Sequence, residues 1–270
     1  MKYCRFNLNG HTRYGSVEDR KGELWIAALA PAPAEDLAYR LALEESPAGN
    51  FNFAPMPLSA AELLPPVTPS KIVCVGRNYR AHVRELGNEM PTEPLIFLKP
   101  PSSLLPPGGV IRMPAVSERV DFEGELAVVI GRRARNLKAG AGWRDVVRGF
   151  TLANDVTARD LQNKDDQWTR AKGFDTFCPI GPIVSDELDL DGGLNIETRL
   201  NGEVRQHAST LDFIFSLSEL LVFITSVFTL EPGDLLLTGT PSGIAPLSPG
   251  DSVEISIPAL GVLSNTVEAR

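Results

Sequence analysis

Cysteine and clusters of positive charge are scarce in this chain of 270 residues. The three cysteines, Cys4, Cys74 and Cys178, are far apart and form no C-x-x-C pair. They therefore predict free thiols in a reducing cytoplasm rather than a disulfide framework. The net charge is −8 and no run of Lys and Arg occurs, which argues against nucleic-acid and membrane-surface partners. A small anionic substrate needs only a few local cations and stays compatible with this charge.

Long uncharged apolar runs are absent as well. The most apolar window, 211–230, contains Asp212 and Glu219, so it predicts a buried or amphipathic helix rather than a membrane span. The N-terminus lacks the apolar core of a signal peptide. The sequence lacks the motifs G-x-x-x-x-G-K-[ST], G-x-G-x-x-G and G-x-S-x-G. Nothing in it therefore supports a nucleotide-binding protein or a serine hydrolase. We therefore expect a cytoplasmic protein with no membrane segment.

The residues that are present predict a β-rich protein in two parts. Apolar residues make up 43% of the chain, enough for a core, and its 23 glycines and 22 prolines predict many turns. The stretch L-L-P-P-V-T-P-S (63–70) predicts a linker. The expected division is a small N-terminal domain with its linker (1–70) and a larger catalytic domain (71–270).

The N-terminal domain is expected to be a small α/β module without catalytic residues. Residues 3–8 and 13–17 predict two strands around the turn pair Asn9-Gly10, and 23–29 predicts a third. Helical spacing extends over 34–45. We expect this module to cover or orient the rest of the chain.

Two glutamates lie in the stretch around which we expect the larger domain to be organised, V-D-F-E-G-E-L-A-V-V-I-G-R (120–132). Because strand side chains alternate, Glu123 and Glu125 share one face, with Gly124 between them. Two neighbouring carboxylates at the start of an apolar strand repel each other, and a bound divalent cation would neutralise this repulsion. A solvated strand end with two ordinary glutamates is the alternative.

A third carboxylate follows a second predicted strand, G-F-T-L-A-N-D (149–155). Asp155 at this strand end would complete a site of three carboxylates, which suits Mg²⁺, Mn²⁺ or Ca²⁺ better than Zn²⁺. Asp155 would alternatively be the N-cap of a helix over 157–161, and both roles are compatible.

Further polar residues follow predicted strands and turns. His82 and Glu85 lie three apart in a predicted helix (77–87), where they would form a base and its orienting partner, or an ordinary exposed pair. Downstream, Arg159 and Lys172 would hold a carboxylate or stabilise charge, although each alone also fits a surface role. The turn T-G-T-P-S-G would place a hydroxyl at a strand end or serve structure alone.

The remaining expected elements are helices over 139–147 and 209–228, a hairpin of 194–200 and 203–206 around Asn201-Gly202, and strands over 71–75, 96–98, 126–130, 235–237, 253–257 and 262–267.

Several stretches together resemble the fumarylacetoacetate hydrolase family. They occur in the family's order over residues 71–270: V-G-R-N-Y-R-A-H-V-R-E, D-F-E-G-E-L-A-V-V-I-G, G-F-T-L-A-N-D-V-T-A-R-D-L-Q, Q-W-T-R-A-K, N-G-E-V-R-Q and P-G-D-L-L-L-T-G-T-P-S-G. The resemblance implies an α+β, mainly β fold, a mixed β-sandwich roll with peripheral helices, usually a homodimer. It implies a Mg²⁺ or Mn²⁺ site at Glu123, Glu125 and Asp155, and catalytic roles for His82, Glu85 and Lys172. Arg159, Gln162 and Thr240 would bind substrate.

The resemblance also implies a reaction class. A 2-oxo acid would chelate the metal, and water deprotonated by His82, oriented by Glu85, would attack a 4-oxo group. The expected function is therefore hydrolysis of a C–C bond in 2,4-dioxo acids of the acylpyruvate type, through an enolate held by the metal. The same enolate would serve isomerisation, tautomerisation or decarboxylation of related 2-oxo acids. A binding protein that keeps the fold without turnover is the alternative from another class.

Overall fold

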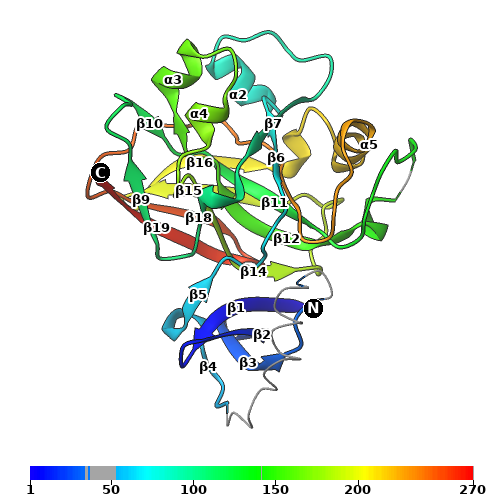
Figure 1. The fold of residues 1–270 in the computed structure, drawn as a ribbon, viewed down its shortest axis with the longest axis vertical. Helices are drawn as coiled ribbons and strands as arrows, with labels where there is room; N and C mark the ends of the chain where they lie inside the picture. The colour runs from blue at the N-terminus through cyan, green and yellow to red at the C-terminus, as the bar shows by residue number, and fades with distance from the viewer. Residues whose placement is uncertain (34–35, 37–52, 141, 270) are drawn as a thin grey trace.

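The computed structural model describes residues 1–33, 36, 53–140 and 142–269, and strands predominate in it (Figure 1). Its helices are short and lie at the periphery, which confirms the predicted mainly β fold class. None of the helices in the described part is long and apolar enough to cross a bilayer. The helices are α2 (Arg80–Glu85), α3 (Arg159–Lys164), α4 (Thr169–Lys172) and α5 (Leu217–Val227).

The largest sheet joins both parts of the chain. Its strands are β1 (Lys2–Leu8), β2 (His11–Arg20), β3 (Glu23–Ala30), β4 (Met56–Pro57), β5 (Glu62–Leu64), β6 (Ile72–Gly76), β7 (Leu95–Lys99), β8 (Leu104–Leu105), β11 (Gly124–Ile130), β12 (Val147–Asn154), β14 (Cys178–Ser185) and β17 (Leu235–Leu237). The main path runs β4-β3-β2-β1-β14-β12-β11-β17-β6-β7, with β5 on β1 and β8 on β14. Strand β11 is buried along its whole length, which agrees with its continuous apolar sequence.

A second sheet covers one face of this one. It has the order β16-β15-β18-β19-β9, and a further pair joins β10 to β13. One core cluster contains residues of both large sheets, among them Leu126 and Val128 of β11 and Ile196 of β15, so the two pack as a sandwich. The strands are β9 (Val110–Met113), β10 (Val120–Asp121), β13 (Thr157–Ala158), β15 (Asn195–Leu200), β16 (Glu203–Ser209), β18 (Ser252–Ile257) and β19 (Gly261–Ala269).

The N-terminal strands are those expected from the sequence. Asn9 and Gly10, with φ of 53° and 79°, form the tight turn between β1 and β2. Strand β1 also pairs with β14, where Tyr3 lies opposite Val184, so the module extends the large sheet. The predicted helix over 34–45 lies outside the described residues, apart from Asp36. All three cysteines are free and buried.

Three predicted helices are wrong or misplaced. Among the described residues of 139–147, a 3₁₀ turn, Trp143–Asp145, replaces the predicted helix and β12 begins at Val147, because Gly140 and Gly142 interrupt the segment. Residues 157–158 form β13 on β10, so α3 begins at Arg159 and Asp155 is no helix cap. The apolar segment 209–228 divides into a 3₁₀ turn, Thr210–Asp212, and α5, because Ser209 and Ser216 each start a capping box.

Candidate active site

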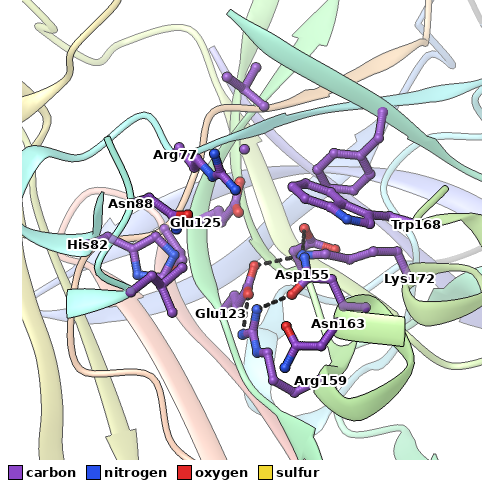
Figure 2. A pocket seen from close by; sticks show the side chains of 16 residues that line it. Arg77, His82, Asn88, Glu123, Glu125, Asp155, Arg159, Asn163, Trp168 and Lys172 are labelled. Carbon is purple, nitrogen blue, oxygen red and sulfur yellow. Dashed lines mark hydrogen bonds and ion pairs between the residues drawn. The ribbon is translucent and has the colours of Figure 1, made fainter. Parts of the chain in front are cut away.

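Three carboxylates meet where β11 and β12 pair. Glu123 precedes β11 and Asp155 follows β12, and the antiparallel register places Gly124 opposite Asn154. The Asp155 amide donates to the Glu123 carbonyl at 2.9 Å. The acidic cluster of Glu123, Glu125 and Asp155 is 4%, 2% and 1% exposed, and one oxygen of each lies within 4.8 Å of the others (Figure 2).

The electrostatics of the acidic cluster favour a cation. Burial, together with Asp155 and Glu123, raises the pKa of Glu125 well above its usual range. Burial alone would also raise the pKa of Glu123, but Lys172 and Arg159 outweigh it and hold that pKa well below its usual range. Glu125 accepts one bond from the described residues, the amide of Gly239 at 2.7 Å. Three buried carboxylates, of which Glu125 is the least neutralised by nearby cations, are suitable ligands for a hard divalent ion such as Mg²⁺ or Mn²⁺.

Two buried cations pair with the acidic cluster. The Lys172 ammonium donates to Glu123 at 2.8 Å and to Asp155 at 2.6 Å. The Arg159 guanidinium donates to Glu123 at 2.6 Å, to Asp121 at 3.0 Å and to Gln162 at 2.5 Å. Arg159 and Lys172 are therefore buried parts of the site. The alternative that each is an ordinary surface residue is wrong.

Sequence reasoning missed Lys99 and Asp121. The Lys99 ammonium donates to Asp155 at 2.7 Å and to the Val156 carbonyl at 3.2 Å. Asp121 is fully buried beneath the Arg159 guanidinium. The one feature of the sequence that could have drawn attention to Lys99 is its place at the end of an apolar strand, where a charged residue is unusual. Its partner, Asp155, becomes apparent only once the pairing of the strands is known.

A histidine and a glutamate form a hydrogen-bonded pair on α2, as their spacing predicts. His82 Nδ1 lies 3.0 Å from a Glu85 carboxylate oxygen, and the other oxygen of Glu85 accepts from the Gly243 amide at 2.9 Å. His82 is 5% exposed. Because Nδ1 contacts Glu85, Nε2 is the ring nitrogen left for a ligand.

One cavity of about 230 Å³ collects these groups. Every predicted site residue except Glu85, which contacts His82, lines it. Arg77, Asn88, Asn163 and Trp168 line it as well (Figure 2). The Thr240 hydroxyl donates to the Gly124 carbonyl and accepts from Gln206, so in this structure it holds the glutamate strand. The predicted residues lining the cavity are His82, Glu123, Glu125, Asp155, Arg159, Gln162, Lys172 and Thr240.

The chain is similar to known proteins over most of its length. Over 269 residues the chain is 45% identical to Protein Rv2993c of Mycobacterium tuberculosis, covering 99% of this chain and 98% of that protein. It is 43% identical over 224 residues to the mitochondrial oxaloacetate tautomerase FAHD2A of Bos taurus, covering 78% of this chain and 71% of the relative.

The crystal structure of 2-hydroxyhepta-2,4-diene-1,7-dioate isomerase from Mycobacterium marinum superposes with a TM-score of 0.83 at 39% identity, covering 100% of this chain and 99% of that one. The family model described as fumarylacetoacetate (FAA) hydrolase C-terminal matches residues 71–268. The chain therefore belongs to the fumarylacetoacetate hydrolase family.

Proposed function

We propose that this enzyme moves a proton at the carbon beside the 2-oxo group of a 2-oxo acid, as an isomerase or tautomerase. The observation that carries the proposal is the His82–Glu85 pair in the same cavity as the buried acidic cluster. The isomerase and tautomerase relatives described above support this reaction, which the sequence analysis placed second to C–C hydrolysis. Glu123, Glu125 and Asp155 would hold Mg²⁺ or Mn²⁺.

Some side chains of the cavity would stabilise charge, and others would transfer the proton. An ion held by Glu123, Glu125 and Asp155 would supply Lewis acidity to the 2-oxo group. His82 accepts the substrate proton at Nε2 and returns it to another carbon or to oxygen. Glu85 stabilises the imidazolium through Nδ1, and the Gly243 amide fixes the Glu85 carboxylate. Burial lowers the pKa of Lys172, but Asp155 and Glu123 together outweigh it and raise that pKa, so the ammonium keeps its positive charge in the cavity.

Hydrolysis is the second candidate, and the same pair favours it. His82, oriented by Glu85, is equipped to deprotonate a water molecule that attacks a 4-oxo group. The products would be a carboxylic acid and a pyruvate-type 2-oxo acid. Decarboxylation of a 2-oxo acid is the remaining reaction of this class.

One assay separates these reactions. The purified protein, with Mg²⁺, Mn²⁺ or a chelator, is given enol oxaloacetate and an acylpyruvate, and ketonisation, pyruvate and CO₂ are followed separately. We expect metal-dependent ketonisation to exceed pyruvate release. Faster release of pyruvate from the acylpyruvate would favour hydrolysis, and turnover unaffected by the chelator would contradict a metal enzyme.

Glu85→Gln tests the proton-transfer pair. The amide keeps the size of the side chain but cannot stabilise an imidazolium, so we expect kcat to fall about 10²- to 10⁴-fold with little change in KM. Glu203→Gln, an exposed residue of β16, makes the same charge change away from the cavity and should leave kcat unchanged. An unchanged kcat in Glu85→Gln would remove the pair from the reaction.

We further propose a cytoplasmic homodimer in which residues 1–70 form a small N-terminal domain whose strands extend the large sheet. The family match begins at residue 71, which supports that division. Strand β7 ends the large sheet, and its Leu95 and Leu98 are 37% and 43% exposed. An apolar edge strand is a surface that a second copy of the chain would cover. The three free, buried thiols fit a reducing compartment.

A further inference from the structure

A row of charged side chains of alternating sign runs through the acidic cluster and continues outside the cavity. Each member lies 2.6–3.0 Å from the next. The row consists, in order, of Arg119, Asp121, Arg159, Glu123, Lys172, Asp155 and Lys99. Of its three carboxylates, Asp121 is the one that does not line the cavity. Asp121 is therefore no ligand for a substrate or metal ion there, and its burial in this row calls for another role.

The short sheet of β10 and β13 holds Arg159 against Asp121. Asp121 lies opposite Thr157 in this sheet, and Arg159 directly follows β13. The Arg159 amide donates to the Arg119 carbonyl at 2.7 Å, and the Arg159 Nε donates to the Asp121 carboxylate at 3.0 Å. Arg119 donates to the same carboxylate through Nε and Nη2, at 2.8 and 3.1 Å. The segment 119–121 therefore fixes both the backbone and the side chain of Arg159.

The bond to Asp121 determines how the Arg159 guanidinium faces the cavity. A guanidinium has five N–H groups. One donates to Asp121, one to Glu123 at 2.6 Å and one to Gln162 at 2.5 Å (Figure 2). The other two have no acceptor in the described part of the chain, and Arg159 lines the cavity. They are thus available to a substrate carboxylate, whose two oxygens match the planar guanidinium.

We propose that Asp121 is a positioning residue that acts on substrate binding through Arg159. The inference rests on the proposed function, in which a 2-oxo acid binds beside the acidic cluster with its carboxylate facing Arg159. Glu123 shares its charge with Lys172 and is a candidate metal ligand. Asp121 is the carboxylate partner of Arg159 that lies outside the acidic cluster, so it keeps the guanidinium oriented whatever the cluster binds.

The test is a double-mutant cycle on Asp121 and Arg159. Wild type, Asp121→Asn, Arg159→Gln and the double variant are titrated with oxalate by calorimetry with Mg²⁺ present, beside kcat and KM for enol oxaloacetate. Oxalate offers a carboxylate next to a second oxygen pair, as a 2-oxo acid does, but it cannot be ketonised. Asp165→Asn is the matched control, because it breaks a twofold contact with Arg170 at the surface, away from the cavity.

We expect Asp121→Asn and Arg159→Gln each to weaken oxalate binding at least tenfold, about 1.4 kcal/mol, and to raise KM by a similar factor with a smaller effect on kcat. In the double variant Asp121→Asn should add less than a twofold loss, because no guanidinium remains to be positioned. Asp165→Asn should behave as wild type. A further tenfold loss in the double variant, or oxalate binding as tight as in wild type by either single variant, would overturn the inference.

The cycle decides even if Asp121→Asn does not fold. That variant leaves the buried guanidinium with one of its two carboxylate partners. The double variant instead replaces the ion pair with two neutral amides, which proteins tolerate better than an uncompensated buried charge. Equal oxalate affinities of Arg159→Gln and the double variant would then support the role of Asp121, and a weaker affinity of the double variant would refute it.

The two proposals fail in different ways. Oxalate affinities that follow the expected cycle, without ketonisation of oxaloacetate by wild type, would support the role of Asp121 and count against the proposed function alone. Metal-dependent ketonisation by wild type, with losses in oxalate affinity that add up in the double variant, would support the proposed function and refute the positioning role.

Discussion

Lys172 shows at the scale of one residue how the acidic cluster is tolerated in a buried place. Its ammonium bridges Glu123 and Asp155 at 2.8 and 2.6 Å and is itself 2% exposed. Breaking a buried pair by removing one partner costs about 3–5 kcal/mol, because the remaining charge stays buried without compensation. Lys172 therefore has a structural role beside the catalytic one proposed for it.

Lys172→Met tests this structural role. Methionine keeps much of the volume but leaves Glu123 and Asp155 without their shared cation, so in the presence of a chelator we expect a loss of about 3–5 kcal/mol in unfolding free energy. Added Mg²⁺ should raise Tm more in the variant than in wild type, because a divalent ion supplies the missing charge. Chemical denaturation and thermal scans measure both effects.

Lys164→Met, an exposed position on α3, is the control and should leave stability within about 0.5 kcal/mol. If Lys172→Met were as stable as wild type without metal, the bridging ammonium would not be what compensates these carboxylates.

The hairpin of β15 and β16 shows, at the scale of elements, what positions the two glutamates. The buried Gln206 of β16 accepts from the Gly124 amide at 3.0 Å and donates to Thr240 and to the Pro241 carbonyl. A Cβ on Gly124 would lie 2.1 Å from the Thr198 hydroxyl of β15. The small residue between the glutamates is thus required by the close approach of the second sheet.

Gly124→Ala should push the hairpin away from β11 and tilt both glutamates. Overpacking of this kind costs about 1–3 kcal/mol, and we expect weaker Mg²⁺ binding in the same variant. Because the Thr198 hydroxyl is buried without a hydrogen-bond partner among the described residues, Thr198→Ala removes the obstacle at small cost. Denaturation and Mg²⁺ titration of the double variant should show partial recovery, and a double variant as impaired as Gly124→Ala would contradict this account.

The sequence predicts most strands of this architecture but only part of the site. Alternation along one strand places Glu123 and Glu125 on one face, and helical spacing pairs His82 with Glu85, because both patterns are local. The contact of Lys99 with Asp155 spans 56 positions and depends on the order of strands in the sheet. The left-handed backbone at Arg77, with a φ of 59°, could not be predicted either, because its segment has the composition of a helix start. The structure shows a turn there instead, which the hydrogen bond from the Asn78 side chain to the Thr238 carbonyl stabilises.

At the scale of the whole molecule, the large sheet ends on a strand that also serves the cavity. Strand β7 pairs with β6 on one side, and its other edge has no strand partner in the described part of the chain. Phe97 lines the cavity and contacts Trp168, with ring centroids 5.3 Å apart, and Lys99 binds Asp155. Because strand side chains alternate, Leu98 lies on the opposite face from Phe97.

Leu98→Asp tests whether this edge is the interface of the proposed homodimer. We expect wild type to sediment at twice the 29.3 kDa of one chain, and a charge at the centre of an apolar interface to shift the variant toward monomer, weakening association at least tenfold or by about 1.4 kcal/mol. Leu211→Asp, which alters an apolar side chain exposed to 63% on another part of the surface, is the control. Sedimentation over a range of concentrations measures both. If Leu211→Asp dissociates the dimer and Leu98→Asp does not, or if wild type stays monomeric, the edge of β7 faces solvent and its two leucines have no partner chain.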